Sequence, residues 1–344
     1  MPVKVLIVDD SAVVRAVLSR ELAKDPQISV VGTAPDPLVA SDKIESLQPD
    51  VVTLDINMPR MDGLTFLRGL MKHRPLPVII VSSVSQVGSK IAMEALEFGA
   101  VDIMQKPGGT ISLPEMSTEL AAKIKAAASA RVRIRHAAPA AMRPKIAPAS
   151  TGPVKSLIAV GASTGGTQAI QTFLTGLPEQ IPPILIVQHM PEGFTRAFAD
   201  RLNGLCPFEV KEAAHGDGVA PNRVLIARGN YHMELAKHGV HFTVDVKDGP
   251  KVQRQRPAAD VLFQSVARLA APMSIGVIMT GMGADGAEGL LAMKKAGART
   301  IAQDEASCVV FGMPKEAIAL GAAEQILPLE RIAEAVVRLS QVTV

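Results

Sequence analysis

The chain has 344 residues and a formal net charge of +3, with 48% apolar and 20% charged residues. This composition is typical of a globular protein and excludes a disordered chain. The length favours two domains, because single hydrophobic cores usually stop growing at roughly 250 residues. The small net charge, an aromatic content of 3% and the absence of Trp give little basis for nucleic-acid binding, which we do not expect.

The hydrophobic segments and the cysteines point to the cytoplasm. No apolar run approaches the roughly 20 residues that a membrane-spanning helix needs. Asp9 and Asp10 interrupt the N-terminal apolar run before the core of a signal peptide could form. Cys206 and Cys308 have neither metal-ligand spacing nor the pattern of a disulfide framework. We therefore expect a cytoplasmic protein that does not span a membrane and whose cysteines are small buried side chains. We also expect a monomer.

In the first 128 residues, short β-branched runs alternate with amphipathic helical stretches. The strand candidates are residues 4–8, 28–32, 51–54, 78–82 and 101–104, and a helical stretch follows each of them. Five such βα units predict a five-stranded, doubly wound parallel sheet of the flavodoxin-like kind, with helices on both faces.

The composition changes over residues 129–153, where Pro139, Pro144, Pro148 and Pro153 are spread among Ala, Ser and Lys. Such a stretch is typical of a linker. It divides the chain into a first domain over residues 1–128 and a second domain over residues 154–344.

The second domain repeats the alternation, with strand candidates at 156–160, 184–188, 274–279 and 299–303. Between the second and third of these, residues 223–245 contain three alternating runs separated by a Gly-Asn and a His-Gly turn. These runs predict a three-stranded antiparallel β-meander. We therefore expect a Rossmann-like α/β domain with an antiparallel β insertion.

Polar residues stand where the strands of the first domain end. Asp9 and Asp10 follow the first strand, Asp55 follows the third, Ser82 ends the fourth, and Lys106 follows the fifth. In a parallel sheet these ends share one edge, where ligands bind. Crowded carboxylates repel unless a hard cation such as Mg²⁺ neutralises them, and Lys106 and Ser82 suit a phosphoryl group on Asp55. The alternative, a surface acidic cluster, needs neither a Lys-Pro pair nor a hydroxyl at those positions.

These residues resemble the motifs of bacterial response-regulator receiver domains. The resemblance rests on VDDS at 8–11, DINMPRMDG at 55–63, VSS at 81–83 and KP at 106–107. It implies that a histidine kinase phosphorylates Asp55, that Asp10, Asp55 and the backbone carbonyl of Asn57 bind Mg²⁺, and that Pro107 is cis. Ile103 departs from the family, because many receivers carry an aromatic switch residue there.

The stretch GASTGG at 161–166 raises a second candidate site. It matches G-x-S-x-G and lies between a predicted strand and a predicted helix, the context in which Ser163 would stand on a sharp turn as a nucleophile. Gly and Ser are also common turn formers, so the stretch alone is a weak signal.

Two further strand ends supply partners for Ser163. His189 follows the strand candidate 184–188 and is placed to act as a general base, and Asp285 follows 274–279, where a carboxylate would orient the imidazole. The loop residue His215 is a second candidate base. Asp260 is an alternative acidic partner, although it opens a predicted helix and an N-cap role explains it at least as well.

The same loop suggests a different class of protein. Gly281, Gly283 and Gly286 spell G-x-G-x-x-G between a strand and a helix, and Asp304 lies about 20 residues further on, as a dinucleotide site requires. The second domain would then be a non-catalytic module that binds a nucleotide or a receptor. This fingerprint usually follows the first strand of its domain, however, and it leaves GASTGG and QHMP without a role.

With Ser163, His189 and Asp285 together, the second domain resembles the catalytic domain of the bacterial chemotaxis protein-glutamate methylesterases, the CheB family. GASTGG, QHMP, RPAADVLF and TGMGADG carry the likeness. It implies demethylation of glutamate γ-methyl esters, and deamidation of glutamines, on methyl-accepting chemotaxis receptors, with no cofactor for the ester step. It also implies that the backbone amide of Met282 binds the oxyanion beside Thr164, and that the unphosphorylated receiver covers the catalytic site.

Overall fold

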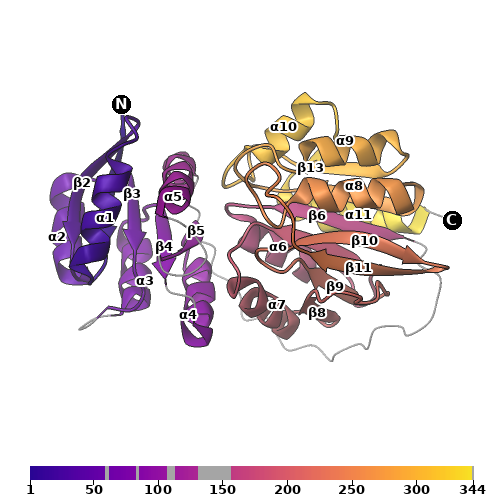
Figure 1. Ribbon diagram of the computed structural model, residues 1–344, viewed down its shortest axis with the longest axis horizontal. Coiled ribbons are helices and arrows are strands. Elements are labelled where there is room, and N and C mark those ends of the chain that lie inside the picture. Colours follow the sequence, from indigo (N-terminus) through magenta and orange to yellow (C-terminus); the bar gives the residue numbers. More distant parts are fainter. Residues whose placement is uncertain (59–61, 83–84, 107–112, 131–155, 343–344) are drawn as a thin grey trace. The chain divides into compact units, whose positions relative to one another are not determined.

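The computed structural model describes residues 1–58, 62–82, 85–106, 113–130 and 156–342. The chain divides into two compact units, one within residues 1–137 and the other within residues 138–344 (Figure 1). Most of the predicted linker and the predicted cis Pro107 lie outside the described residues. The domain bounds therefore stay predictions.

The first unit is the predicted five-stranded parallel sheet. Its strand order is β2-β1-β3-β4-β5, the order of flavodoxin-like folds. The strands are β1 (Val3–Val8), β2 (Ile28–Ala34), β3 (Val51–Leu54), β4 (Val78–Ser82) and β5 (Asp102–Gln105). The helices between and after them are α1 (Ala12–Leu22), α2 (Pro37–Leu47), α3 (Gly63–His73), α4 (Gln86–Glu97) and α5 (Leu113–Ala128).

Side-chain caps fix where the helices of this unit begin. Ser11, Asp36, Asp62 and Ser85 each accept a hydrogen bond from a backbone N–H in the first turn of the helix that follows. Such caps satisfy N–H groups that have no partner inside the helix. Each cap leaves a short loop between the strand and the helix, so the polar residues in that loop stay at the carboxyl edge of the sheet.

The second unit is built on a seven-stranded parallel sheet with the order β14-β13-β12-β6-β7-β9-β8. Its strands are β6 (Leu157–Ala162), β7 (Ile184–Gln188), β8 (Glu209–Glu212), β9 (Arg223–Ile226), β12 (Ser274–Ile278), β13 (Arg299–Gln303) and β14 (Gln325–Leu327). The sequence prediction missed β8 and β14, which form the two edges of the sheet. Four of the seven strands were predicted as such.

The predicted three-stranded meander is wrong in one strand. Only β10 (His232–His238) and β11 (His241–Lys247) form an antiparallel hairpin, whereas β9 pairs parallel with β7 and with β8. The run RVLI of β9 is almost wholly buried, which is typical of a central parallel strand rather than of a half-exposed meander strand. The insertion is thus a two-stranded hairpin.

Helices cover both faces of the second sheet. The helices α8 (Ala259–Ala270), α9 (Ala287–Lys295) and α10 (Met313–Ala319) lie together with the hairpin, while α6 (Gly166–Thr175) packs against α7 (Phe194–Leu205) and α11 (Leu329–Val342) (Figure 1). Phe173 of α6 and Phe263 of α8 are both fully buried. The sheet is therefore buried on both sides, and its strand ends are the places where polar side chains can act.

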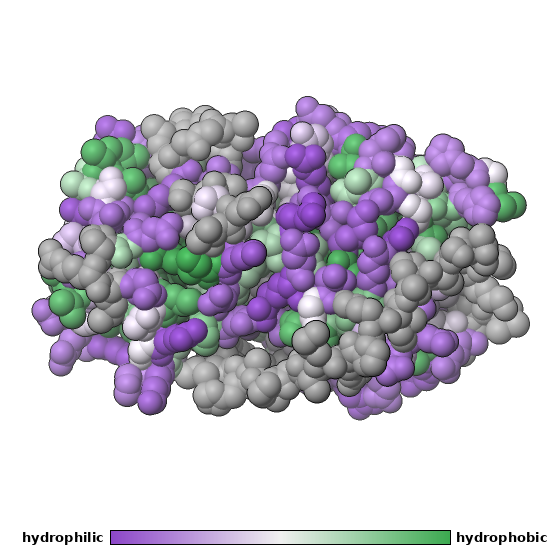
Figure 2. All heavy atoms as spheres, turned by 90° about the horizontal axis from the view of Figure 1, so that it is seen from below, coloured by the Kyte–Doolittle hydropathy of each residue, from purple (hydrophilic) through white to green (hydrophobic). Residues whose placement is uncertain are grey.

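Within the described residues, no helix is both long enough and apolar enough to cross a membrane. On the face of the molecule that Figure 2 draws, hydrophilic side chains are interspersed with smaller hydrophobic areas.

Candidate active site and phosphorylation site

The acidic residues of the first unit converge as the sequence predicts. Asp9, Asp10 and Asp55 offer carboxylate oxygens that all lie within 4.8 Å of one another. Asp9 and Asp55 are buried, at 1% and 2% exposure, and Asp10 is exposed. Ser82, at the end of β4, is fully buried. The cluster therefore opens to solvent on the side of Asp10.

Lys106 supplies the cation of this cluster. Its Nζ lies 2.8 Å from Asp9 Oδ2 and 2.7 Å from Asp55 Oδ2. Burial raises the pKa of Asp55, and the hydrogen bond from Lys106 offsets this only in part. Burial acts to lower the pKa of Lys106, but its two carboxylate partners outweigh burial and raise it. The carboxylates thus keep Lys106 charged.

The donor set of the cluster fits Mg²⁺. Three carboxylates face one ammonium group, so two negative charges remain to be balanced. Hard oxygen ligands with solvent access on one side are what Mg²⁺ takes in proteins, because it keeps several of its waters. The backbone N–H of Asn57 donates to Asp55 Oδ1 at 3.2 Å, which places Asn57 next to the cluster.

Ser163 stands between two other strand ends of the second unit. Ala162 pairs with Gln188 across β6 and β7, so Ser163 and His189 follow neighbouring strands at the same level. The N–H of Ser163 donates to the Thr280 carbonyl, which follows β12 on the other side, at 3.0 Å. The three strand ends that carry Ser163, His189 and Asp285 are thus adjacent in the sheet.

The glycines after Ser163 form the sharp turn into α6. Gly165 has a φ of 76°, in the left-handed region, and a Cβ there would lie 2.5 Å from Val309 Cβ. The Gly166 N–H donates to the Ser163 carbonyl at 2.7 Å. A side chain at Gly165 would be strained and would also collide with the loop after β13. These contacts explain why a strand, a serine and two glycines occur in this order.

His189 and Asp285 form a buried pair. His189 Nε2 lies 2.6 Å from Asp285 Oδ2, and the two residues are 6% and 2% exposed. Asp285 Oδ2 also accepts the Ala259 N–H at 2.6 Å, and Oδ1 accepts the Asp260 N–H at 3.0 Å. Burial acts to raise the pKa of Asp285, but the hydrogen bond and charge of His189 outweigh it and lower the pKa.

The first turn of α8 therefore fixes the Asp285 carboxylate, and this carboxylate in turn fixes the His189 imidazole. Asp285 accepts N–H groups of that turn that have no partner inside the helix, where the helix dipole also favours a negative charge. Because Nε2 of His189 points at Asp285, the Nδ1 atom remains for other chemistry. In the described part of the chain, Nδ1 is buried and has no hydrogen-bond partner.

Of the two residues predicted for the oxyanion site, Thr164 follows Ser163 directly, and Met282 follows Gly281, which packs against Ser163. Thr164 is 2% exposed, and its carbonyl accepts the Thr280 hydroxyl at 3.0 Å. Met282 is half-buried and follows Gly281, where an added Cβ would lie 2.8 Å from Ser163 Cβ. Among the described residues, the Met282 N–H has no hydrogen-bond acceptor.

The structure assigns Asp260 neither of its predicted roles. Ala258 is the N-cap of α8, and Asp260 lies inside the first turn. Its Oδ1 accepts the Gly289 N–H of α9 at 2.7 Å, so it ties two helices together. His215, the second candidate base, has an exposed side chain and lies 3.6 Å from Asp245 of the hairpin.

Asp260 gives a testable pH dependence of stability. Burial raises its pKa from the ordinary value of 3.8 to about 6, and the Gly289 N–H offsets this only in part. The folded state thus holds the proton more tightly than the unfolded state, so stability is lost as pH rises through about 6. Relative to Asp260→Asn, we expect the free energy of unfolding of the natural chain to fall by roughly 2 to 3 kcal/mol between about pH 4 and pH 7.

Tyrosine fluorescence can follow this change, because Tyr231 is the only tyrosine and the chain has no Trp. Denaturant titrations at several pH values would therefore report on the second unit. A stability difference between the two proteins that does not change with pH would contradict the assignment.

The glycine-rich loop does not serve a dinucleotide in the predicted manner. Gly281 packs against Ser163 and Met313, and Asp285 of the same loop bonds to His189. Asp304 accepts hydrogen bonds from the backbone N–H and the hydroxyl of Ser307, so its carboxylate closes a local turn. The dinucleotide alternative is therefore not supported.

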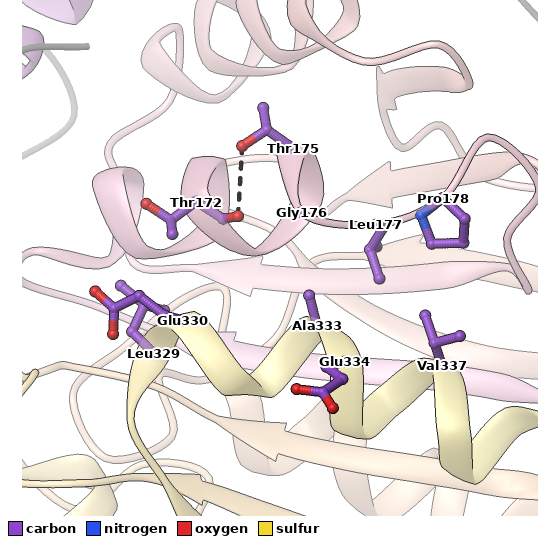
Figure 3. A pocket seen from close by; sticks show the side chains of 10 residues that line it. All are labelled: Thr172, Thr175, Gly176, Leu177, Pro178, Leu329, Glu330, Ala333, Glu334 and Val337. Carbon is purple, nitrogen blue, oxygen red and sulfur yellow. Dashed lines mark hydrogen bonds between the residues drawn. The ribbon is translucent and has the colours of Figure 1, made fainter. Parts of the chain in front are cut away.

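A surface hollow of about 530 Å³ lies away from these residues. Figure 3 shows it between α6 and α11, with Thr172 and Thr175 on α6 and Glu330 and Glu334 on α11 among the residues that line it. The side chains that line it include none from the strand ends that carry Ser163, His189 and Asp285. The hollow thus does not mark the candidate active site.

Two buried polar side chains near Ser163 were missed at the level of sequence. The Thr280 hydroxyl donates to the Thr164 carbonyl and accepts the Val310 N–H at 3.0 Å. Gln188 donates to the carbonyls of Ser163 and His189. The only sequence signal for either is a polar residue that ends an otherwise apolar strand.

The fold and the site define a class: a receiver-type unit joined to an α/β unit with a buried serine, histidine and aspartate at one sheet edge. Residues 5–117 match the response regulator receiver domain family, and residues 158–336 match the CheB methylesterase family. The chain belongs to the CheB methylesterase family.

Relatives match over nearly the whole chain. The protein-glutamate methylesterase/protein-glutamine glutaminase 2 of Syntrophus aciditrophicus is 55% identical over 98% of this chain and 99% of its own length. Its counterpart in Rhodospirillum rubrum is 53% identical over 98% of both chains. The crystal structure of the Thermotoga maritima CheB methylesterase catalytic domain is 38% identical, covers 54% of this chain and 98% of that one, and superposes with a TM-score of 0.53.

Proposed function

We propose that this protein is a phosphorylation-activated serine hydrolase. It demethylates glutamate γ-methyl esters on chemotaxis receptors and deamidates specific receptor glutamines. The observation that carries the proposal is the buried set at one sheet edge: Ser163 beside His189, whose Nε2 is held by Asp285 at 2.6 Å. The names of relatives that match end to end support the choice of substrate.

In the first half of the reaction, Ser163 Oγ attacks the γ-carbonyl carbon of the substrate. His189 Nδ1 takes the hydroxyl proton, because Nε2 is already bonded to Asp285. A C–O bond forms, and the carbonyl electron pair moves to the oxygen. When that pair returns, the bond to the leaving group breaks, and His189 gives its proton to methoxide, which leaves as methanol, or to the amide nitrogen, which leaves as ammonia.

In the second half, water repeats the attack on the glutamyl-Ser163 ester. His189 removes a proton from the water and then returns a proton to Ser163 Oγ as the ester bond breaks. The product is a glutamic acid side chain, which releases its proton to water and becomes the carboxylate, and the enzyme returns to its starting state. Asp285 stays ionised throughout and stabilises the imidazolium, which agrees with the lowered pKa of its carboxyl group.

The oxyanion that forms in both halves needs fixed donors. The Met282 N–H, which has no acceptor within the described residues, is such a donor, and Thr164 lies next to the serine. Backbone donors that are already in place cost no rearrangement during the reaction. Gly281 permits this approach because a side chain there would collide with Ser163.

The first unit is the switch. A histidine kinase supplies the phosphoryl group to Asp55, and Asp10, Asp55 and the Asn57 carbonyl would hold Mg²⁺. Bound Mg²⁺ would neutralise the charge of the phosphoryl group. Lys106 adds a second cation from its position between Asp9 and Asp55. Phosphorylation is proposed to activate the enzyme by relieving inhibition of the active site by the first unit.

A cytoplasmic location is part of the proposal, because the proposed partners act there. Chemotaxis histidine kinases and the methylated segments of the receptors are the proposed partners, and nucleic acid is not among them. The ester step needs no cofactor, because the acid, the base and the nucleophile are all side chains of this chain.

Methanol release from methylated chemoreceptor tests the proposal. With Mg²⁺ and a small-molecule phosphodonor, the initial rate should rise at least severalfold, and Asp55→Asn should abolish the rise while keeping the basal rate. Asp42→Asn, an exposed aspartate on α2, is the matched control and should respond like the natural chain. Methanol release at the same rate with and without the phosphodonor would reject activation by phosphorylation. The absence of any methanol release would reject the esterase activity.

A further inference from the structure

Gln188 has a side chain that no step of the proposed reaction uses. It is the last residue of β7, it follows four apolar residues, and it is 2% exposed. Burying an amide costs free energy unless hydrogen bonds compensate for the lost water. The partners of this amide therefore show what the side chain does.

The amide nitrogen of Gln188 joins the backbones of the two key residues. Nε2 donates to the Ser163 carbonyl at 2.8 Å and to the His189 carbonyl at 3.2 Å. Both contacts are buried, and they link the ends of the neighbouring strands β6 and β7. One side chain thus spans the nucleophile and the base.

The amide oxygen of Gln188 lies against the start of α6. A Cβ on Gly166 would come within 2.1 Å of Oε1, so the amide fills the space that a side chain at Gly166 would need. Within the described residues, Oε1 has no hydrogen-bond partner. The last glycine of GASTGG, Gly166, and the glutamine of QHMP therefore depend on each other.

We infer that Gln188 is a positioning residue, which holds Ser163 and His189 at their working separation through the two N–H groups of its amide. This inference rests on the proposed function, because it assigns a role in bringing the serine to its base. It requires the donor groups of the side chain and not only its volume. A misplacement of the order of 1 Å between reacting groups is enough to slow an enzyme about a hundredfold.

The test compares Gln188→Glu and Gln188→Met in the full chain activated with a phosphodonor. The probe is a fluorophosphonate, which labels an activated serine and does not depend on the natural ester. Both variants should label Ser163 about 10- to 100-fold more slowly, and kcat for methanol release should fall with KM nearly unchanged. An unlabelled natural chain would overturn the proposed function, whereas equal labelling of all three proteins would overturn only the role of Gln188.

A pH series separates positioning from packing. In Gln188→Glu, a buried carboxylate would face two carbonyl oxygens, which favours its protonated form, and that form has one O–H donor. The labelling rate of Gln188→Glu relative to Gln188→Met should therefore rise as pH falls from about 8 to about 6. A ratio that stays constant would contradict the need for a donor.

Asn222→Ala is the matched control. Asn222 carries another buried side-chain amide, and its Oδ1 accepts the Ile181 N–H at 2.9 Å, at the opposite ends of β7 and β9. Loss of the Asn222 amide should lower the denaturant midpoint, followed by Tyr231 fluorescence, at least as much as Gln188→Met does. The rate of Ser163 labelling should nevertheless stay within twofold of that of the natural chain. Equal slowing in Asn222→Ala would show that lost stability, not lost positioning, explains the effect.

Discussion

Replacement of Ser163 by Ala is expected to lower the rate of methanol release about 10⁴-fold or more. The hydroxyl is the atom that forms the acyl bond, and its loss leaves only the contribution of the oxyanion donors and of substrate binding. The fold should tolerate the change, because the contacts recorded for Ser163 are made by its backbone, to Thr280, Gly166 and Gln188. Activated full-length protein and methylated receptor are the materials for the measurement.

Ser274→Ala provides the comparison for this variant. Ser274 is also a buried serine, but it starts β12 and thus lies at the opposite edge of the sheet. Its hydroxyl bonds to the Ala271 carbonyl at 3.0 Å, so its loss should cost stability and leave the rate nearly unchanged. A loss of less than tenfold in Ser163→Ala would reject the serine mechanism.

The residues at strand ends were predictable because parallel sheets obey a simple rule. Asp9, Asp55 and Lys106 follow three different strands, yet their carboxyl ends share one edge, and the ion pairs confirm that they meet. The same rule brought His189 to Asp285. Short apolar runs locate such ends well, so the two clusters could be placed without a structure.

Other features depend on contacts that sequence does not reveal. The run RVLI of β9 has the same composition as a meander strand, and only its pairing with β7 and β8 shows that it runs parallel to them. Asp260 has the position of a cap in the sequence, but α8 begins two residues earlier than that role requires, and the Asp260 carboxylate bonds to Gly289 instead. The packing of α8 on α9 brings the Gly289 N–H to the Asp260 carboxylate.

Gln188 shows the same limit at the active site. A glutamine at the end of ILIV is a signal that something polar is buried there. Its two acceptors come from β6 and from the residue that follows β7, so their identity requires the register of the sheet. The sequence therefore carries a signal at Gln188, but it does not reveal which groups the amide binds.

Asp285→Asn is expected to lower the rate of methanol release by about 10³- to 10⁴-fold. Asp285 accepts three N–H groups, from His189, Ala259 and Asp260, and asparagine has one acceptor oxygen in place of two. If its NH₂ faces the imidazole, Nε2 must accept, and the proton moves to Nδ1, where it blocks the base. If its oxygen faces the imidazole, the NH₂ meets the Asp260 N–H, and the imidazolium still loses its counter-charge.

Asp260→Asn is the control that separates charge near the site from the contact with His189. Both aspartates are 2% exposed and lie close together, but Asp260 bonds to α9 and does not bond to His189. Its rate should therefore stay within a few-fold of the natural chain, although its stability changes with pH. If Asp260→Asn lost the larger share of activity, the carboxylate partner of His189 would be Asp260, and the hydrogen bond at 2.6 Å would belong to a resting arrangement that the reaction does not use.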